Sequence, residues 1–312
     1  MSTDGGNRIA LAIAAKLTSV SLFVMVAAMV KWLDSVPTGQ IVFFRSAFAI
    51  PVIIAWVASM GQFPGGLSTR QPFSHVWRGL LGTCAMALSF TALTLLPLPV
   101  ATVLNYVAPL LVVILSIAIL GEAFRWALIA GVLLGLVGVG MSVWPQLQPG
   151  SSVDVSAAPT IGVGVALLAA LFAAVVQVLI RKMIAAEAIA AIVFWFSMTS
   201  MLAALVTLPF GWIVPEPGHL AVLILSGLLG GFAQMLMTTA YRFGDASVVA
   251  PFDYWAIVLA LILGVLVYGD IPDPMMLTGA AIIVSAGLMI IWQERRSGRR
   301  LITSKQGVPP NG

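Results

Sequence analysis

Residues 98–119 read LPVATVLNYVAPLLVVILSIAI, and residues 246–267 read ASVVAPFDYWAIVLALILGVLV. The first stretch has no charged side chain and the second has one, Asp253. Because a hydrocarbon core offers the backbone no hydrogen-bond partners, apolar runs of about 20 residues predict helices that cross a membrane. A tyrosine stands at the same position of each stretch, Tyr106 in one and Tyr254 in the other. The two stretches therefore predict a pair of related transmembrane helices.

The composition extends this interpretation to the whole chain. Of its 312 residues, 61% are hydrophobic and 8% are charged, whereas soluble domains have about 45–50% apolar and about 25% charged residues. A chain with so few charges cannot cover a globule with hydrated side chains, so lipid must solvate most of its surface. The formal charge of +4 could indicate a nucleic-acid partner. The basic residues stand in short loops and at the C-terminus, as membrane topology requires, so we expect the lipid bilayer as partner and no nucleic acid.

Clusters of glycine and proline divide the chain into about ten apolar runs of membrane-spanning length. We predict spans at 9–31, 38–59, 75–95, 98–119, 125–144, 160–182, 188–210, 218–240, 246–267 and 274–292.

Lysine and arginine residues fix the predicted orientation. Most of the fifteen fall on the side of the membrane that holds the N-terminus, Lys31 alone is opposite, and Lys16 and Arg45 lie within spans. Both termini are therefore expected in the cytoplasm, and we expect a multi-pass protein of the bacterial inner membrane. The basic residues on the N-terminal side are Arg8, Arg70, Arg78, Arg125, Arg181, Lys182, Arg242, Arg295, Arg296, Arg299, Arg300 and Lys305.

The two halves of the chain resemble each other. A shift of 148 positions aligns residues 80–144 with 228–292 without a gap, and a shift of 151 aligns Lys31 with Lys182. Five is an odd number of spans, so the halves must cross the membrane in opposite senses. We predict an all-α membrane protein of about ten transmembrane helices, arranged as two inverted five-helix repeats around a central cavity. The predicted units are a first repeat at 1–146, a linker outside the cytoplasm at 147–159, a second repeat at 160–292 and a basic cytoplasmic tail at 293–312.

Three ionisable residues fall well inside the predicted spans: Lys16, Arg45 and Asp253. A charge at the centre of a span costs roughly 2.5–3.5 kcal/mol on insertion scales, so such a residue usually faces a partner or a cavity. Lys16 and Asp253 both stand about seven residues, on the order of 10 Å, from the cytoplasmic ends of their helices, which predicts an ion pair. That pair is either purely structural or linked to substrate or proton movement. Arg45 has no acid at its level, and it either snorkels to the interface or binds an anionic group.

Several uncharged side chains are further candidates for contact with a substrate. Asn105 is the repeat mate of Asp253, and Pro109 cannot donate to the Asn105 carbonyl, which leaves that acceptor for a substrate or water. Gln234 lies on a glycine-rich helical face and either serves helix packing or lines a cavity. Packing is also the alternative for the aromatic candidates. The remaining members of the predicted substrate-binding set are Tyr106, Tyr254, Trp255, Trp195 and Gln177.

Short motifs recur in both halves: Ala108-Pro109-Leu110 and Leu120-Gly121-Glu122 in the first, and Ala250-Pro251-Phe252-Asp253-Tyr254 and Tyr268-Gly269-Asp270 in the second. These motifs resemble those of the EamA family of the drug/metabolite transporter superfamily. The resemblance implies ten helices around a cavity lined mainly by helices 1, 3, 4, 6, 8 and 9. It also implies transport of metabolites such as amino acids, vitamins or nucleotide-like compounds, riboflavin and S-adenosylmethionine among them. Asp270 stands where the family commonly has Glu, and we expect Glu122 and Asp270 at helix ends.

Inverted repeats with a site near the midplane are a recurring transporter design. We therefore predict a secondary active transporter that moves a small organic metabolite by alternating access. A multidrug or toxic-metabolite exporter is the alternative, followed by a channel or a membrane enzyme. His75 and His219 fall near opposite membrane faces and the sequence has no HExxH motif, so we predict no catalytic residues. The single cysteine, Cys84, excludes a cysteine-based zinc site. We expect no metal or other cofactor, and a monomer or homodimer.

Overall fold

The structure is a computed structural model that describes residues 3–120, 126–147, 158–183, 186–243 and 246–306. Within these ranges the chain is helical and has no strand, which confirms the predicted fold class. Among the described residues, nine helical segments are long and apolar enough to cross a membrane, and Ile189–Leu205 is a shorter apolar helix. The α-helices are α1 (Thr3–Trp32), α2 (Thr38–Ser59), α3 (Pro72–Leu95), α4 (Leu98–Asn105), α5 (Val107–Leu120), α6 (Trp126–Leu147), α7 (Ala158–Met183), α8 (Ile189–Leu205), α9 (Pro217–Phe243), α10 (Ala246–Val249), α11 (Trp255–Leu263) and α12 (Pro274–Gln306). The short turns are η1 (Gly65–Leu67), η2 (Leu208–Phe210), η3 (Ala250–Tyr254) and the π-helical η4 (Gly264–Tyr268).

Proline residues account for three departures of the helices from the predicted spans. The run predicted at 188–210 is helical only to Leu205, because Pro209 has no N–H to donate to the Leu205 carbonyl. The run at 98–119 divides into α4 and α5 at Tyr106. Tyr106 follows Asn105, whose carbonyl cannot receive a hydrogen bond from Pro109. The run at 246–267 divides at η3, which contains Pro251. The two interrupted helices thus break at equivalent positions of the repeat.

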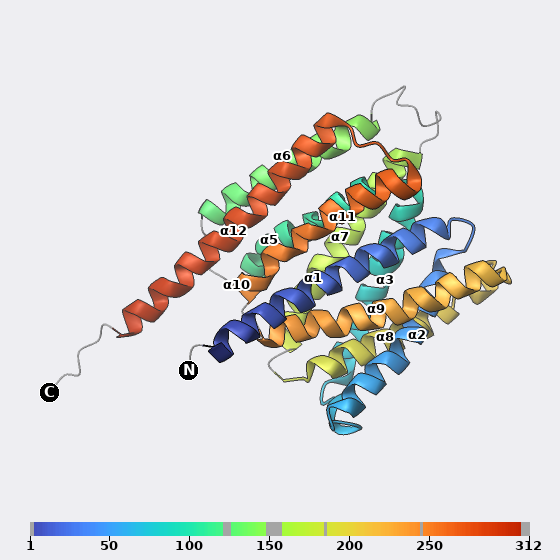
Figure 1. Ribbon diagram of the computed structural model, residues 1–312, viewed down its shortest axis with the longest axis horizontal. Coiled ribbons are helices and arrows are strands. Elements are labelled where there is room, and N and C mark those ends of the chain that lie inside the picture. The colour runs from blue at the N-terminus through green and yellow to red at the C-terminus, as the bar shows by residue number, and fades with distance from the viewer. Residues whose placement is uncertain (1–2, 121–125, 148–157, 184–185, 244–245, 307–312) are drawn as a thin grey trace.

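Eight of the spans form a closed ring. In the order α1, α9, α2, α8, α3, α7, α4–α5 and η3–α11, each member contacts the next and the last contacts the first. Helices α6 and α12 are absent from this order; they lie side by side and pack on each other (Figure 1). The repeat pairs α1 with α7, α2 with α8, α3 with α9, and α4–α5 with η3–α11. If each helix is replaced by its partner, the same ring results, followed in the opposite direction. The arrangement is the one that a two-fold relation between the halves would produce.

Close contacts at glycines repeat in the same way. A Cβ on Gly230 would lie 3.0 Å from the guanidinium carbon of Arg45, and a Cβ on Gly82 would lie 2.8 Å from the ring of Phe196. The shift of 148 positions aligns Gly82 with Gly230, and the shift of 151 aligns Arg45 with Phe196. The two contacts are therefore equivalent in the repeat. Two further pairs of contacts are related by these shifts: Gly227–Phe48 with Gly79–Thr199, and Gly279–Ser142 with Gly131–Ile290.

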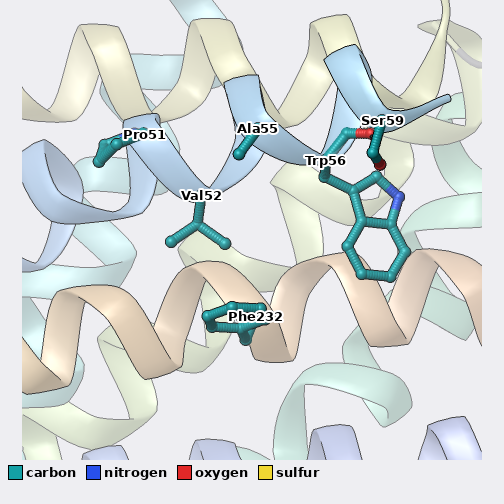
Figure 2. A pocket seen from close by; sticks show the side chains of 6 residues that line it. All are labelled: Pro51, Val52, Ala55, Trp56, Ser59 and Phe232. Carbon is teal, nitrogen blue, oxygen red and sulfur yellow. The ribbon is translucent and has the colours of Figure 1, made fainter. Parts of the chain in front are cut away.

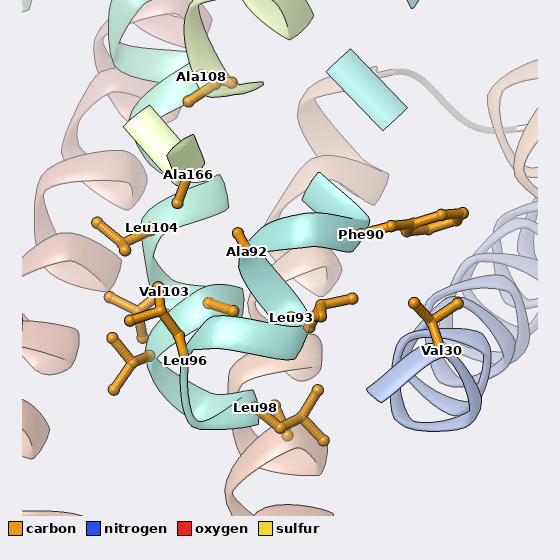
Figure 3. Packing of buried hydrophobic residues seen from close by; sticks show 14 of the residues in the cluster. Val30, Phe90, Ala92, Leu93, Leu96, Leu98, Val103, Leu104, Ala108 and Ala166 are labelled. Carbon is orange, nitrogen blue, oxygen red and sulfur yellow. The ribbon is translucent and has the colours of Figure 1, made fainter. Parts of the chain in front are cut away.

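The largest buried cluster lies at the end of the bundle where α3 turns into α4, which we call the Pro97 end. Figure 3 shows Val30, Phe90, Leu93, Leu96 and Leu98 converging there from α1, α3 and α4. Val30 and Leu98 have no exposed surface. Apolar side chains therefore fill the space between these helices at this end. The opposite end, which holds residues 60–71 and 186–188, we call the Pro64 end.

A polar contact reinforces the Pro97 end. The Asp270 carboxylate accepts a hydrogen bond from the backbone N–H of Leu98 (3.1 Å) and lies 3.8 Å from Lys31 Nζ. Lys31 also donates to the carbonyl of Leu96 (2.8 Å). The first N–H groups of a helix have no intrahelical acceptor and favour a carboxylate, so Asp270 caps α4. Asp270 thus lies at a helix end as expected, whereas Glu122 lies outside the described residues.

Candidate functional site

The candidate site is built around an ion pair between α1 and η3. Lys16 Nζ lies 2.7 Å from the Asp253 carboxylate and donates to the Tyr241 hydroxyl at 3.1 Å. The ammonium group is also 4.7 Å from the centre of the Tyr241 ring. The Lys16 side chain has no exposed surface, whereas a third of the Asp253 side chain is exposed. The expected ion pair is therefore present, and Asp253 is the member of the pair that is accessible.

The two repeat-related tyrosines hold the interrupted helices together beside this pair. Their rings stack with centres 5.0 Å apart and an angle of 23° between planes. The Tyr106 hydroxyl donates to the backbone carbonyl of Asp253. The Tyr254 hydroxyl packs against Gly287 of α12, where a Cβ would collide with it. Tyr106 thus fixes the backbone at the residue that carries the carboxylate.

An aromatic groove of about 610 Å³ adjoins the ion pair. Trp255 is 37% exposed in this groove, and its indole N–H donates to the Ser21 hydroxyl at 3.2 Å. Ligand pockets range over about 300–1,000 Å³ and are mostly apolar with a few polar groups. The groove is therefore large enough for a metabolite with a flat ring. Its lining residues are Leu17, Pro251, Phe252, Tyr254, Trp255, Ile257, Val258 and Val284.

The remaining predicted site residues lie elsewhere. Gln234 is half-buried on α9, two helical turns from Tyr241 on the same face. Asn105 and Gln177 are exposed, on α4 and α7. The Trp195 indole N–H donates to the carbonyl of Leu67 (3.0 Å), so this ring ties α8 to η1 at the Pro64 end. Among the described residues, none of these four side chains forms a hydrogen bond or ion pair with the side chain of Lys16 or Asp253.

Arg45 lies within the bundle and is 8% exposed. Its guanidinium group packs against Gly230 of α9. Among the described residues no acidic side chain forms an ion pair with it. Gly230 and Tyr241 share a face of α9 and are about 16 Å apart at about 1.5 Å per residue. One face of α9 therefore runs from Arg45 past Gln234 to the ion pair.

A second buried arginine, Arg78, was not predicted from the sequence. Arg78 was expected among the basic residues that flank the spans, yet it is 6% exposed inside α3, and its guanidinium carbon lies 4.1 Å from the centre of the Phe196 ring. His75, one turn before it, is 1% exposed, and its Nε2 lies 3.5 Å from Glu187. The available signal was the spacing of His75, Arg78 and Gly82 on one helical face.

Glu187 closes the Pro64 end and lies outside the spans. Its carboxylate accepts hydrogen bonds from the backbone N–H of Arg70 (2.8 Å) and the hydroxyl of Thr69 (3.0 Å). Burial raises the pKa of this carboxyl, but these hydrogen bonds and the neighbouring His75 outweigh burial and hold the pKa below its ordinary value. The contact therefore stabilises the folded state above the ordinary pKa of the carboxyl, and that stabilisation is lost as the pH falls through the lowered value.

A second groove, of about 430 Å³, lies between α2 and α9. Figure 2 shows Val52 and Phe232 facing each other across it, with Pro51, Ala55 and Trp56 along α2. Its one hydroxyl group, on Ser59, donates to the carbonyl of Trp56. The lining has no charged side chain, so this groove offers a metabolite only apolar contact.

Comparison with known proteins agrees with this architecture. Residues 8–144 and 160–292 match the model of the EamA-like transporter family. The chain is 29% identical to the S-adenosylmethionine uptake transporter of Rickettsia prowazekii, over 83% of this chain and 84% of that protein. It is 30% identical to the pseudopaline exporter CntI of Pseudomonas aeruginosa, over 87% and 92% respectively. It is 28% identical to the riboflavin transporter of Vibrio cholerae, over 84% and 86%.

A solved crystal structure superimposes with a TM-score of 0.66 at 22% sequence identity, covering 91% of this chain and 98% of the other, which shows a shared fold. The family model covers both halves and nearly all of the described spans. This chain therefore belongs to the EamA-like transporter family, within the drug/metabolite transporter superfamily.

Proposed function

We propose that the protein is a secondary active transporter that moves a small organic metabolite by alternating access. The observation that carries this proposal is the Lys16–Asp253 pair, buried on one side and open on the other, next to the aromatic groove. A charged pair within a membrane is costly and usually marks the path of a substrate or proton. The exposed face of Asp253 can exchange its partner for a substrate cation or accept a proton.

The substrate class that fits this site best has a flat ring and both signs of charge. Trp255 and Tyr254 offer ring faces for stacking, Asp253 can bind a cationic group, and Arg45, which has no acidic partner among the described residues, can bind a carboxylate. S-adenosylmethionine, named for the relatives in Rickettsia, has an adenine ring, a sulfonium, an ammonium and a carboxylate. Riboflavin, named for other relatives, would use the ring faces but not the charges. The apolar lining of the groove supports the second candidate, an exporter of hydrophobic drugs or toxic metabolites.

Alternating access is supported by the contacts that close the Pro97 end and by the position of the site. At the Pro97 end, apolar packing and the Lys31–Asp270 contact join α1, α4 and η4. The site itself lies beside two helix interruptions, at Tyr106 and at η3. Interrupted helices at a repeat interface are where transporters of this design bind their substrates. Breaking the Asp270 contacts would free the Pro97 end, so this pair is suited to close one side of the pathway.

Counterflow in proteoliposomes tests the proposed function. Vesicles containing purified protein and loaded with unlabelled S-adenosylmethionine should accumulate labelled S-adenosylmethionine transiently above the external concentration, with saturable initial rates. A carrier must show this exchange, because each labelled molecule that enters binds a site vacated by an unlabelled one. Conductance without counterflow would indicate a channel instead. Counterflow with riboflavin or a hydrophobic cation, but none with S-adenosylmethionine, would reassign the substrate class.

The proposed orientation has both termini in the cytoplasm of a bacterial inner membrane. Cys84→Ala removes the only native cysteine, and single cysteines can then be placed at Thr69, Ser152 or Ser304. Only the cysteine at position 152 should react with an impermeant thiol reagent added to intact cells. Permeabilised cells, in which all three should react, provide the control for accessibility. Labelling at 69 or 304 in intact cells would reverse the orientation.

A further inference from the structure

Arg78 is a buried cation, and two of its three guanidinium nitrogens lack a hydrogen-bond partner among the described residues. Its Nε and Nη1 are buried without a hydrogen-bond acceptor, and no acidic side chain among the described residues forms an ion pair with it. The Phe196 ring covers the face of the guanidinium at 4.1 Å. A ring face attracts the cation but cannot accept the hydrogen bonds that the edge of the guanidinium donates. The edge of Arg78 therefore has unused capacity for an acceptor.

The acid beside His75, Glu187, already has other partners. The Glu187 carboxylate receives hydrogen bonds from Thr69 and Arg70 and lies 3.5 Å from His75. His75 stands one turn from Arg78 on the same face of α3, and among the described residues neither of its ring nitrogens forms a hydrogen bond. Two buried side chains that can donate hydrogen bonds thus stand next to each other on α3 at the Pro64 end.

Arg78 lies at the interface of α3 with α8, which the repeat relates to the interface of α2 with α9 that holds Arg45. Phe196 packs on Gly82 where, by the repeat, Arg45 packs on Gly230. Since the Arg78 guanidinium lies 4.1 Å from the Phe196 ring, it stands close to the place that is equivalent to the Arg45 side chain. The sequence repeat aligns neither arginine with another arginine. The repeat relates the interface of α2 with α9 to that of α8 with α3, and the fold gives each of these two interfaces one buried guanidinium, Arg45 on α2 and Arg78 on α3.

We propose that Arg78, supported by His75, is an anion-binding site at the Pro64 end, and that it is the counterpart of Arg45 for a carboxylate or phosphate group. An unpaired buried charge with unsatisfied donors destabilises the folded state, and a planar fork of N–H groups matches a carboxylate or phosphate. The assignment of that anion to the transported metabolite rests on the proposed function. A carboxylate bound by Arg45 in one state would be received by Arg78 in the other. Arg45 and Arg78 thereby mark the two ends of the path of the anionic group.

Thermal unfolding of the purified full-length protein in detergent tests the site without knowledge of the substrate. Inorganic phosphate is the probe, compared with chloride at equal ionic strength. Wild type should be stabilised by about 3 °C at ten times the Kd. Arg78→Met should lose part of this shift and Arg45→Met/Arg78→Met all of it. Arg242→Met, which removes an exposed arginine at the same end of the bundle, should keep it. In chloride, Arg78→Met should unfold at the same or a higher temperature than wild type, because it removes an unpaired buried charge.

Two results would overturn the proposal. If Arg78→Met keeps the full phosphate shift, or if it unfolds several degrees below wild type in chloride, the guanidinium serves packing against Phe196. If phosphate has no effect but nanodiscs with phosphatidylglycerol stabilise wild type and not Arg78→Met, relative to phosphatidylcholine, the ligand is a lipid headgroup. Counterflow separates this inference from the proposed function. If wild type binds phosphate at Arg78 but does not exchange S-adenosylmethionine, the anion site is retained and S-adenosylmethionine is rejected as the substrate.

Discussion

Asp253→Asn is expected to abolish most transport and to lower the thermal stability of the protein. The change leaves the fully buried Lys16 ammonium beside a neutral amide, with only the Tyr241 hydroxyl as a further partner. Removing one member of a buried ion pair costs about 3–5 kcal/mol, because the remaining charge has lost its compensation. Lys16→Met should cost less, since the carboxylate that it leaves behind is partly exposed. Unfolding temperature and counterflow are the two measurements.

The double mutant Lys16→Met/Asp253→Asn separates the structural role from the transport role. It should regain most of the stability lost in Asp253→Asn, since no uncompensated charge remains. It should nevertheless fail to transport, because the substrate or proton no longer meets a carboxylate. Lys182→Met, on an exposed lysine of the second half, is the matched control and should behave as wild type. Additive stability losses would mean that the two residues are uncoupled, and a stable double mutant with full transport would make the pair purely structural.

Most of the fold follows from the sequence because its causes are local. Runs of apolar residues free of charge fix the helices, and Pro109 fixes the break at Tyr106, because a missing N–H acts within one turn. The ion pair was also predictable, since equal depth is enough to bring two charges together when few charges are available in the spans. The early end of α8 shows the limit of hydropathy: residues 206–210 are apolar enough to span, but Pro209 prevents the helix from continuing.

The part of the site that sequence reasoning missed depends on which way each helix faces. Arg78 is near the start of a span, where a basic side chain usually reaches water. It is buried because Gly79 and Gly82 allow α8 to approach α3 closely on that face, and no local pattern specifies this packing partner. Trp195 was expected near a substrate for its ring, yet the position of α8 directs its N–H to Leu67. Gln177 lies on the exposed side of α7 for the same kind of reason.

Arg45 is expected to bind an anionic group of the substrate, and its replacement should weaken transport without unfolding the protein. Its guanidinium is buried against Gly230 and has no acidic partner among the described residues. Arg45→Lys keeps the charge but loses the planar fork, so transport should weaken. Arg45→Met should weaken it further, by roughly 10- to 100-fold in kcat/KM, as expected for loss of a charge-assisted hydrogen bond of about 1.5–3 kcal/mol.

The decisive comparison uses S-adenosylmethionine and an analogue whose carboxylate is replaced by an amide. Wild type should transport the amide less well than the parent compound, because the anion that Arg45 binds is missing. The Arg45 variants should handle the amide about as well as wild type does, since the lost interaction is no longer available to either protein. Arg242→Met, on an exposed arginine, should show the wild-type preference for the carboxylate. An equal fractional loss on both compounds would assign Arg45 to packing or to the conformational change, and a transported substrate without any anionic group would exclude its role as an anchor.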